Sequence, residues 1–175
     1  MEIDERLKLY TAYADIGRKW TSTMDSKGTF FSALNGGLLA FLWSGLKIEQ
    51  WTGIEKYLAL CSTASSILAI IAALLVIIPR EKLSLLVGKK SPWTAEYKPW
   101  SFYGYLAKKY GASGYKQMLV DFRKVGQEEF AYEALEQHLA ISCIIQRKSN
   151  WVFRSGFSTL VSLTCIGTAM FIKLI

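Results

Sequence analysis

The stretch from residue 25 to residue 43 reads DSKGTFFSALNGGLLAFLW, and within it the chain changes from a charged arm to an apolar segment. Charges stop at Lys27, and 19 uncharged residues follow from 28 to 46. An α-helix rises about 1.5 Å per residue, so this run covers the roughly 30 Å hydrocarbon core of a bilayer. Asn35, Gly36 and Gly37 stand near its middle. Because these residues suit a purely lipid-facing helix poorly, we expect them to serve packing or function.

Two more uncharged runs follow, with 22 residues from 57 to 78 and 18 residues from 155 to 172. The chain has 175 residues, of which 51% are hydrophobic, and too little of it remains to cover three such runs with protein. We therefore predict an all-α membrane protein with transmembrane helices at 28–46, 57–79 and 155–173. A secretory signal peptide is not expected, because the first run begins only after 27 residues of charged, amphipathic sequence.

The basic residues predict the orientation of these spans. Five Lys and Arg residues precede the first run, two lie in the turn 47–56, thirteen lie in 80–154 and one lies in the C-terminal tail. Cytoplasmic segments carry the excess of positive charge. The N-terminus and residues 80–154 are therefore expected in the cytoplasm of a bacterial cell, with the spans in its inner membrane.

Local patterns predict helices outside the spans. Apolar residues recur every three or four positions over 1–27, which indicates an amphipathic cytoplasmic helix that continues into the first run. Pro79 is predicted to end the second span, and the prolines after it indicate a loop. Within the cytoplasmic helical region 80–154, short helices are expected at 102–110 and after a Ser113 cap. From Gln127 onward we expect one helix that enters the third span.

Small residues repeat every four positions in the first run, at Ser32, Gly36, Ala40 and Ser44. Membrane helices associate through such stripes and through interhelical hydrogen bonds. Asn35 lies beside the stripe and needs a partner or water at this depth. Two interpretations stay open. Ser32, Asn35 and Gly36 either pack one bundle or line a hydrated interior, and the second requires several copies because three helices cannot enclose a pathway.

Eight aromatic residues lie between 93 and 115, with lysines interleaved. Rings that stack on bases, among cations that pair with phosphates, suit a nucleotide or a short oligonucleotide. The same pattern suits an interfacial aromatic belt with topology-setting lysines, or a surface for anionic lipid headgroups. The candidate nucleotide-binding residues are Lys108, Lys109, Arg123, Lys124, Arg147, Lys148, Tyr103, Tyr105 and Tyr110.

No catalytic motif is evident in the chain. The single histidine, His138, is expected to be a packing residue, and Cys61, Cys143 and Cys165 have neither disulfide nor metal-ligand spacing. There is no Gly-rich phosphate loop and no serine elbow. An enzyme is therefore not expected, nor is a cofactor or a metal.

Three stretches resemble one family. MDSKG at 24–28 and LNG at 34–36 resemble its "A-D-T-K-A … L-x-x-N-G" pattern, with Ser26 for Thr and Gly28 for Ala. FYGYLAKKY at 102–110 is similar to its "F-F-G-x-I-A". LEQHLAISCIIQRK at 135–148 is similar to its closing "L-x-x-Q-I-x-x-x-S-x-I-x-x-x-K". The family is that of the small transmembrane effectors of bacterial anti-phage nucleotide signalling, which includes the Pycsar transmembrane, SLATT-type and Hailong membrane effectors.

The resemblance implies a partner nucleotidyltransferase encoded nearby, whose cyclic nucleotide or oligonucleotide controls a membrane-depolarising homo-oligomer that aborts infection. With it, we expect a pore-forming effector of four or more copies. The alternative is a non-conducting membrane anchor or scaffold that recruits a cytoplasmic partner or anionic lipid.

Overall fold

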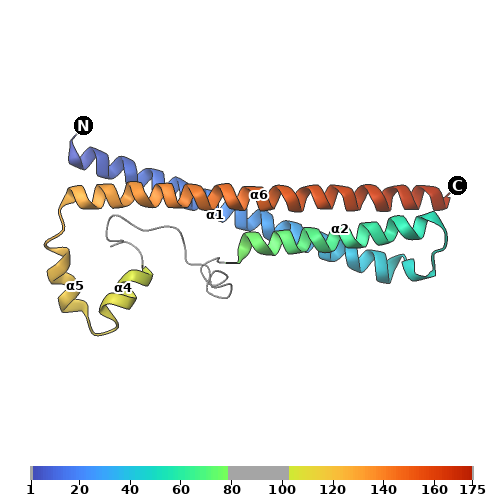
Figure 1. The fold of residues 1–175 in the computed structure, drawn as a ribbon, viewed down its shortest axis with the longest axis horizontal. Coiled ribbons are helices and arrows are strands. Elements are labelled where there is room, and N and C mark those ends of the chain that lie inside the picture. Colours follow the sequence, from blue (N-terminus) through green and yellow to red (C-terminus); the bar gives the residue numbers. More distant parts are fainter. Residues whose placement is uncertain (1, 79–102, 175) are drawn as a thin grey trace. The chain divides into compact units, whose positions relative to one another are not determined.

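The computed structural model describes residues 2–78 and 103–174, and every regular element among them is helical. The all-α class predicted from the sequence is therefore confirmed for the described part of the chain. The elements, shown in Figure 1, are α1 (Ile3–Ala40), a π-helix (Phe41–Gly45), a short 3-10 helix (Ile48–Gln50), α2 (Ile54–Ile77), α4 (Tyr103–Tyr110), α5 (Tyr115–Phe122) and α6 (Gln127–Leu174). They form two compact units.

Unit 2, which comprises residues 21–83 and 145–175, contains the three apolar runs. Its helices bury residues at alternating spacings of three and four, the repeat of left-handed helix packing. On α2 the buried series is Ala59, Ser62, Ser66, Ala69, Ala73 and Val76; on α6 it is Ser155, Thr159, Ser162, Ile166 and Ala169; on α1 and its continuation it includes Gly28, Asn35 and Leu42. The seam of this bundle is thus made mostly of small and hydroxyl-bearing side chains.

An apolar cluster closes one end of unit 2, where the chain turns from the first run to the second. Leu42, Ile48, Trp51, Ala59, Ile166 and Ala169 form it. The Trp51 indole N–H donates to the Leu46 carbonyl at 3.1 Å, and the Lys173 ammonium lies 4.3 Å from the Trp51 ring centroid. This cluster fixes the turn and joins all three helices of the unit.

Unit 1, which comprises residues 1–20 and 84–144, contains the start of α1, the α4–α5 hairpin and the start of α6. Ala14 and Ala131 are buried, and the Phe122 and Phe130 rings lie 5.9 Å apart. Both α1 and α6 begin in unit 1 and continue into unit 2.

The helix bounds agree with the sequence for α1 and α6 and differ at the start of α5 and at the end of the first run. The amphipathic arm and the start of the first run form one helix, α1, and α6 runs unbroken from Gln127 into the third run. The Ser113 cap was wrong: α5 begins at Tyr115 with Gly114 at its N-cap and no side-chain capping bond. The chain instead turns through Gly111, whose φ of 61° lies in the left-handed region.

Two described helices, α2 and α6, are long and apolar enough to cross a membrane by length and composition. The first run divides between α1, which ends at Ala40, and the π-helix that follows. Helix α2 ends at Ile77, and Ile78 is extended, as expected for a residue before proline. Pro79, the loop after it and Phe102 lie outside the described residues.

Candidate functional site

The amide of Asn35 is completely buried in unit 2 and links two helices. Its Nδ2 donates to Thr159 Oγ1 on α6 at 2.8 Å and to the Phe31 carbonyl at 2.8 Å. The Thr159 hydroxyl in turn donates to the Ser155 carbonyl at 2.8 Å. Asn35 Oδ1 is also buried, and no described residue bonds it. Buried polar atoms are normally hydrogen-bonded, so this oxygen is an exception within the seam.

Three serines form a hydroxyl cluster between α2 and α6. The Ser62 and Ser66 hydroxyl oxygens each lie 2.7 Å from that of Ser162. All three side chains are fully buried. Further along the same two helices, the Ser155 hydroxyl of α6 donates to the Ala69 carbonyl of α2 at 2.8 Å. Hydroxyls therefore line much of the α2–α6 seam inside the apolar segments.

Ser32 and Gly36, which the sequence predicts beside Asn35, are less buried than Asn35. Ser32 is half-buried, and Gly36 is exposed with no atom within 4 Å of the position that a Cβ would occupy. The role of Ser32 and Gly36 in a helix seam or a hydrated interior stays a prediction. Sequence reasoning missed the hydroxyl cluster as a unit, although the three-and-four spacing of Ser62, Ser66 and Ala69 was a signal that could have revealed it.

The MDSKG residues hold α1 against both neighbouring helices. Asp25 forms an ion pair with Lys148 of α6. A Cβ on Gly28 would lie 3.2 Å from the Ala73 carbonyl oxygen and 3.2 Å from Val76 Cβ of α2. In unit 2 the Asp25–Lys148 and Asn35–Thr159 pairs show that α1 and α6 run parallel. Lys148, a predicted ligand cation, therefore has a carboxylate partner within the chain.

The α4–α5 hairpin contains a charged cluster centred on Asp121. The Lys109 ammonium donates to Asp121 Oδ2 at 2.9 Å, and the Tyr110 hydroxyl donates to the same oxygen at 2.7 Å. The hydrogen bonds from Tyr110 and Lys109 lower the pKa of Asp121 to about 2. Lys109 and Tyr110 thus already bind one anionic group within unit 1.

The remaining predicted ligand residues are distributed over both units. Lys108, Arg123 and Lys124 are exposed in unit 1, and Arg147 is exposed on the α6 segment of unit 2. Tyr103 and Tyr105 belong to α4. The structure therefore groups Lys108, Lys109, Tyr110, Arg123 and Lys124 in one unit. It describes Arg147 and Lys148 in the other. The aromatic residues Trp93, Tyr97 and Trp100 lie outside the described residues.

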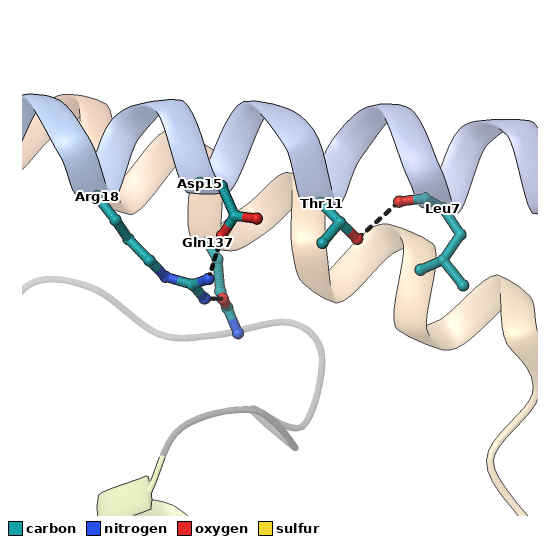
Figure 2. A network of polar contacts seen from close by, with 5 residues as sticks. All are labelled: Leu7, Thr11, Asp15, Arg18 and Gln137. Atoms are coloured by element: carbon teal, nitrogen blue, oxygen red, sulfur yellow. Dashed lines mark hydrogen bonds and ion pairs between the residues drawn. The ribbon is translucent and has the colours of Figure 1, made fainter.

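A second polar network, which sequence reasoning missed, joins α1 and α6 in unit 1. Figure 2 shows the Arg18 guanidinium reaching Asp15 Oδ1 at 2.6 Å and Gln137 Oε1 at 3.3 Å. Gln137 donates to Glu133 at 2.9 Å, and Glu133 is buried. His138 packs its ring 5.5 Å from that of Tyr13. Among the described residues, no group of three side chains is arranged to hold a metal ion.

The low pKa of Asp121 predicts how the hairpin responds to acid. A carboxylate whose pKa falls from 3.8 to about 2 on folding stabilises the folded hairpin above pH 4, and this contribution is lost as the pH falls through 2. We expect the Asp121 carboxyl carbon to titrate near pH 2 by NMR in detergent micelles. Tyr110→Phe and Lys109→Ala should each raise this midpoint. A midpoint near 4 in the unmodified protein would contradict the hydrogen-bonded arrangement.

A family model described as the Pycsar effector protein domain matches residues 10–174. Neither a curated protein nor a solved structure matches the chain. The matched range includes the Asn35 site, the hydroxyl cluster and the α4–α5 hairpin.

Proposed function

This chain belongs to the Pycsar effector protein family, and from that premise we propose that it is a pore-forming membrane effector of anti-phage defence. A cyclic nucleotide from an associated cyclase is the signal that this family implies. On infection the signal changes the conductance of a homo-oligomer in the bacterial inner membrane. Ions then cross the membrane, and depolarisation aborts infection.

One observation carries the proposal: a polar seam runs inside segments that are otherwise apolar. Asn35, Thr159, Ser62, Ser66 and Ser162 are each at most 3% exposed. In a bilayer, polar side chains are placed at such positions for helix contacts or for a hydrated path. Hydroxyl and amide groups can replace part of the water around an ion, and an apolar seam cannot.

The topology in this proposal uses three spans. Helices α2 and α6 supply two of them, and the first run supplies the third through the end of α1 and the π-helix. The arm 1–27 and residues 80–154 lie in the cytoplasm, as the basic residues predict. The nucleotide-facing cations in this proposal are Lys108, Lys109, Arg123 and Lys124, which all belong to unit 1.

The test is single-channel current from the purified chain in planar bilayers, before and after addition of cyclic nucleotides. Current that changes with one nucleotide supports the proposal. A Lys108→Ala/Lys109→Ala variant should lose at least tenfold in nucleotide response. An Arg6→Ala/Lys8→Ala variant, which removes the same charge from unit 1, should keep the response. Equal responses of both variants would remove the hairpin lysines from the site.

A second candidate function is favoured because most polar side chains of the seam form hydrogen bonds within one copy of the chain. Ser62 and Ser66 each bond Ser162, and Asn35 bonds Thr159, so most of these groups need no ion or water. The chain would then be a non-conducting anchor that brings a cytoplasmic partner to the membrane. Folded, inserted protein without current under any nucleotide would favour this candidate.

A further inference from the structure

Unit 1 exposes a row of large apolar side chains on α1, outside the apolar runs of the sequence. Leu9, Tyr13, Ile16 and Trp20 are 37%, 41%, 50% and 52% exposed. Their spacings are four, three and four, which is the repeat of a helix-packing stripe. Single exposed apolar residues are common, but a regular row of four on one helix of a cytoplasmic segment indicates a contact surface.

The row lies on a different face of α1 from the buried residues of that helix, although Tyr13 also touches α6 at the edge of the row, with its ring 5.5 Å from that of His138. The buried residues in this part of α1 include Ala14 and Gly17, which lie between Tyr13 and Arg18, two residues that contact α6. The inner series of α1 consists of the buried or half-buried residues Tyr10, Ala14, Gly17 and Thr21. Each exposed residue of the row stands one position before a member of this series. One residue turns an α-helix by about 100°, so α1 carries two packing faces, and the described residues fill only the inner one.

Helix α6 has a matching row. Leu135 and Leu139 are 39% and 54% exposed, and each follows a position of the inner series, Ala134 or His138, by one. In a parallel helix pair, residues just before the inner positions of one helix lie beside residues just after those of the other. The two rows therefore lie on the same flank of the α1–α6 pair and form one apolar face.

The opposite flank of the same pair supports this assignment. Arg18 follows the inner residue Gly17, Gln137 precedes the inner residue His138, and the two side chains bond each other (Figure 2). That is the lateral contact expected for two parallel helices in this register. One flank thus carries a polar bond between the two helices, whereas the other presents the apolar face.

We propose that this face, formed by Leu9, Tyr13, Ile16, Trp20, Leu135 and Leu139, binds the same face of a second copy of the chain, so that two α1–α6 pairs form a cytoplasmic four-helix bundle. This rests on the proposed homo-oligomer and names its contact outside the membrane. The six side chains expose on the order of 600 Å² per copy, a large patch for a monomer and most of the roughly 800 Å² that each partner contributes to a standard interface.

A second copy fits this face for two reasons. Its occupant needs helices with the same three-and-four spacing, and unit 1 of the chain itself provides them in α1 and α6. Copies inserted in one membrane also share one orientation, so a two-fold axis parallel to the helices sets α1 of one copy against α6 of the next. Confinement to the membrane raises their effective concentration.

Cross-linking tests the proposal. Ser142 is exposed and follows the inner residue Ile141 on α6, so it lies on the same flank, close to the expected two-fold axis. In a background with the three native cysteines replaced by serine, oxidised membranes should give disulfide-linked dimers from Ser142→Cys or from Tyr13→Cys. Ile144→Cys, which points from the opposite side of α6 and is also exposed, should stay monomeric.

A charge on the face should break the contact. Ile16→Glu in the Ser142→Cys background is expected to reduce the dimer at least fivefold, and Ile144→Glu should leave it unchanged. Failure of both Ser142→Cys and Tyr13→Cys to cross-link, or dimers that Ile16→Glu leaves unaltered, would overturn the proposal. Current is recorded separately: conduction without these dimers overturns only this interface, whereas dimers without conduction overturn only the pore.

Discussion

Replacing Asn35 with aspartate is expected to destroy the three-helix bundle of unit 2, whereas replacing it with leucine should leave the bundle folded. Asn35 is 0% exposed, and its neighbours are hydroxyl and carbonyl oxygens of α1 and α6. A carboxylate there would face acceptors inside a membrane segment, at a cost of about 3 kcal/mol. The measurement is thermal unfolding in detergent, followed by tryptophan fluorescence.

The leucine variant is the matched control, because leucine has a similar volume and no charge. It removes one hydrogen bond within α1, to the Phe31 carbonyl, and one between helices, to Thr159. A hydrogen bond between membrane helices contributes on average about 0.6 kcal/mol. We therefore expect a small loss of stability and normal insertion. If the seam conducts ions, the folded leucine variant should still lose nucleotide-dependent current, whereas an anchor would keep its function. An aspartate variant as stable as the unmodified protein would instead show that water already reaches position 35.

The helices themselves followed from the sequence because their signals are local. The acidic start at Gln127–Glu129 and the unbroken apolar pattern after it were enough to predict α6, and the arm 1–27 predicted the start of α1. The α5 start was wrong because Ser113 and Gly114 compete for one N-cap, and the left-handed Gly111 before them sets the geometry of the turn. That geometry depends on backbone angles that composition does not determine.

The packing faces were harder to predict, because they depend on residues far apart in the chain. The stripe from Ser32 to Ser44 has a spacing of four, but the seam of unit 2 uses alternating threes and fours through Gly28, Asn35 and Leu42. Both spacings pack membrane helices, and the partner helix decides between them. Of Ser32, Asn35 and Gly36, which the sequence predicts at a helix contact, the structure buries Asn35 in the seam. The Asp25–Lys148 ion pair joins residues 123 positions apart, and no local pattern reveals it.

Gly28 is the position at which a larger side chain should separate α1 from α2. A Cβ there would meet the Ala73 carbonyl oxygen at 3.2 Å, Val76 Cβ at 3.2 Å and Ile77 Cγ1 at 3.3 Å. These contacts are tight but adjustable by a few tenths of an ångström, so Gly28→Ala should change stability only slightly. Gly28→Leu adds three more carbons between two helices, and overpacking of this kind costs about 1–3 kcal/mol.

The control for Gly28→Leu is Gly37→Leu, on the same helix and in the same apolar run. No atom lies within 4 Å of a Cβ at Gly37, and the residue is exposed. Leucine is a better helix former than glycine by about 0.8 kcal/mol, so the control should unfold at the same temperature as the unmodified protein or higher. A stability order of Gly37→Leu, Gly28→Ala and then Gly28→Leu would support the α1–α2 contact. Equal unfolding temperatures for the two leucine variants would mean that α1 and α2 do not approach each other at Gly28, and the seam built on that approach would have to be redrawn.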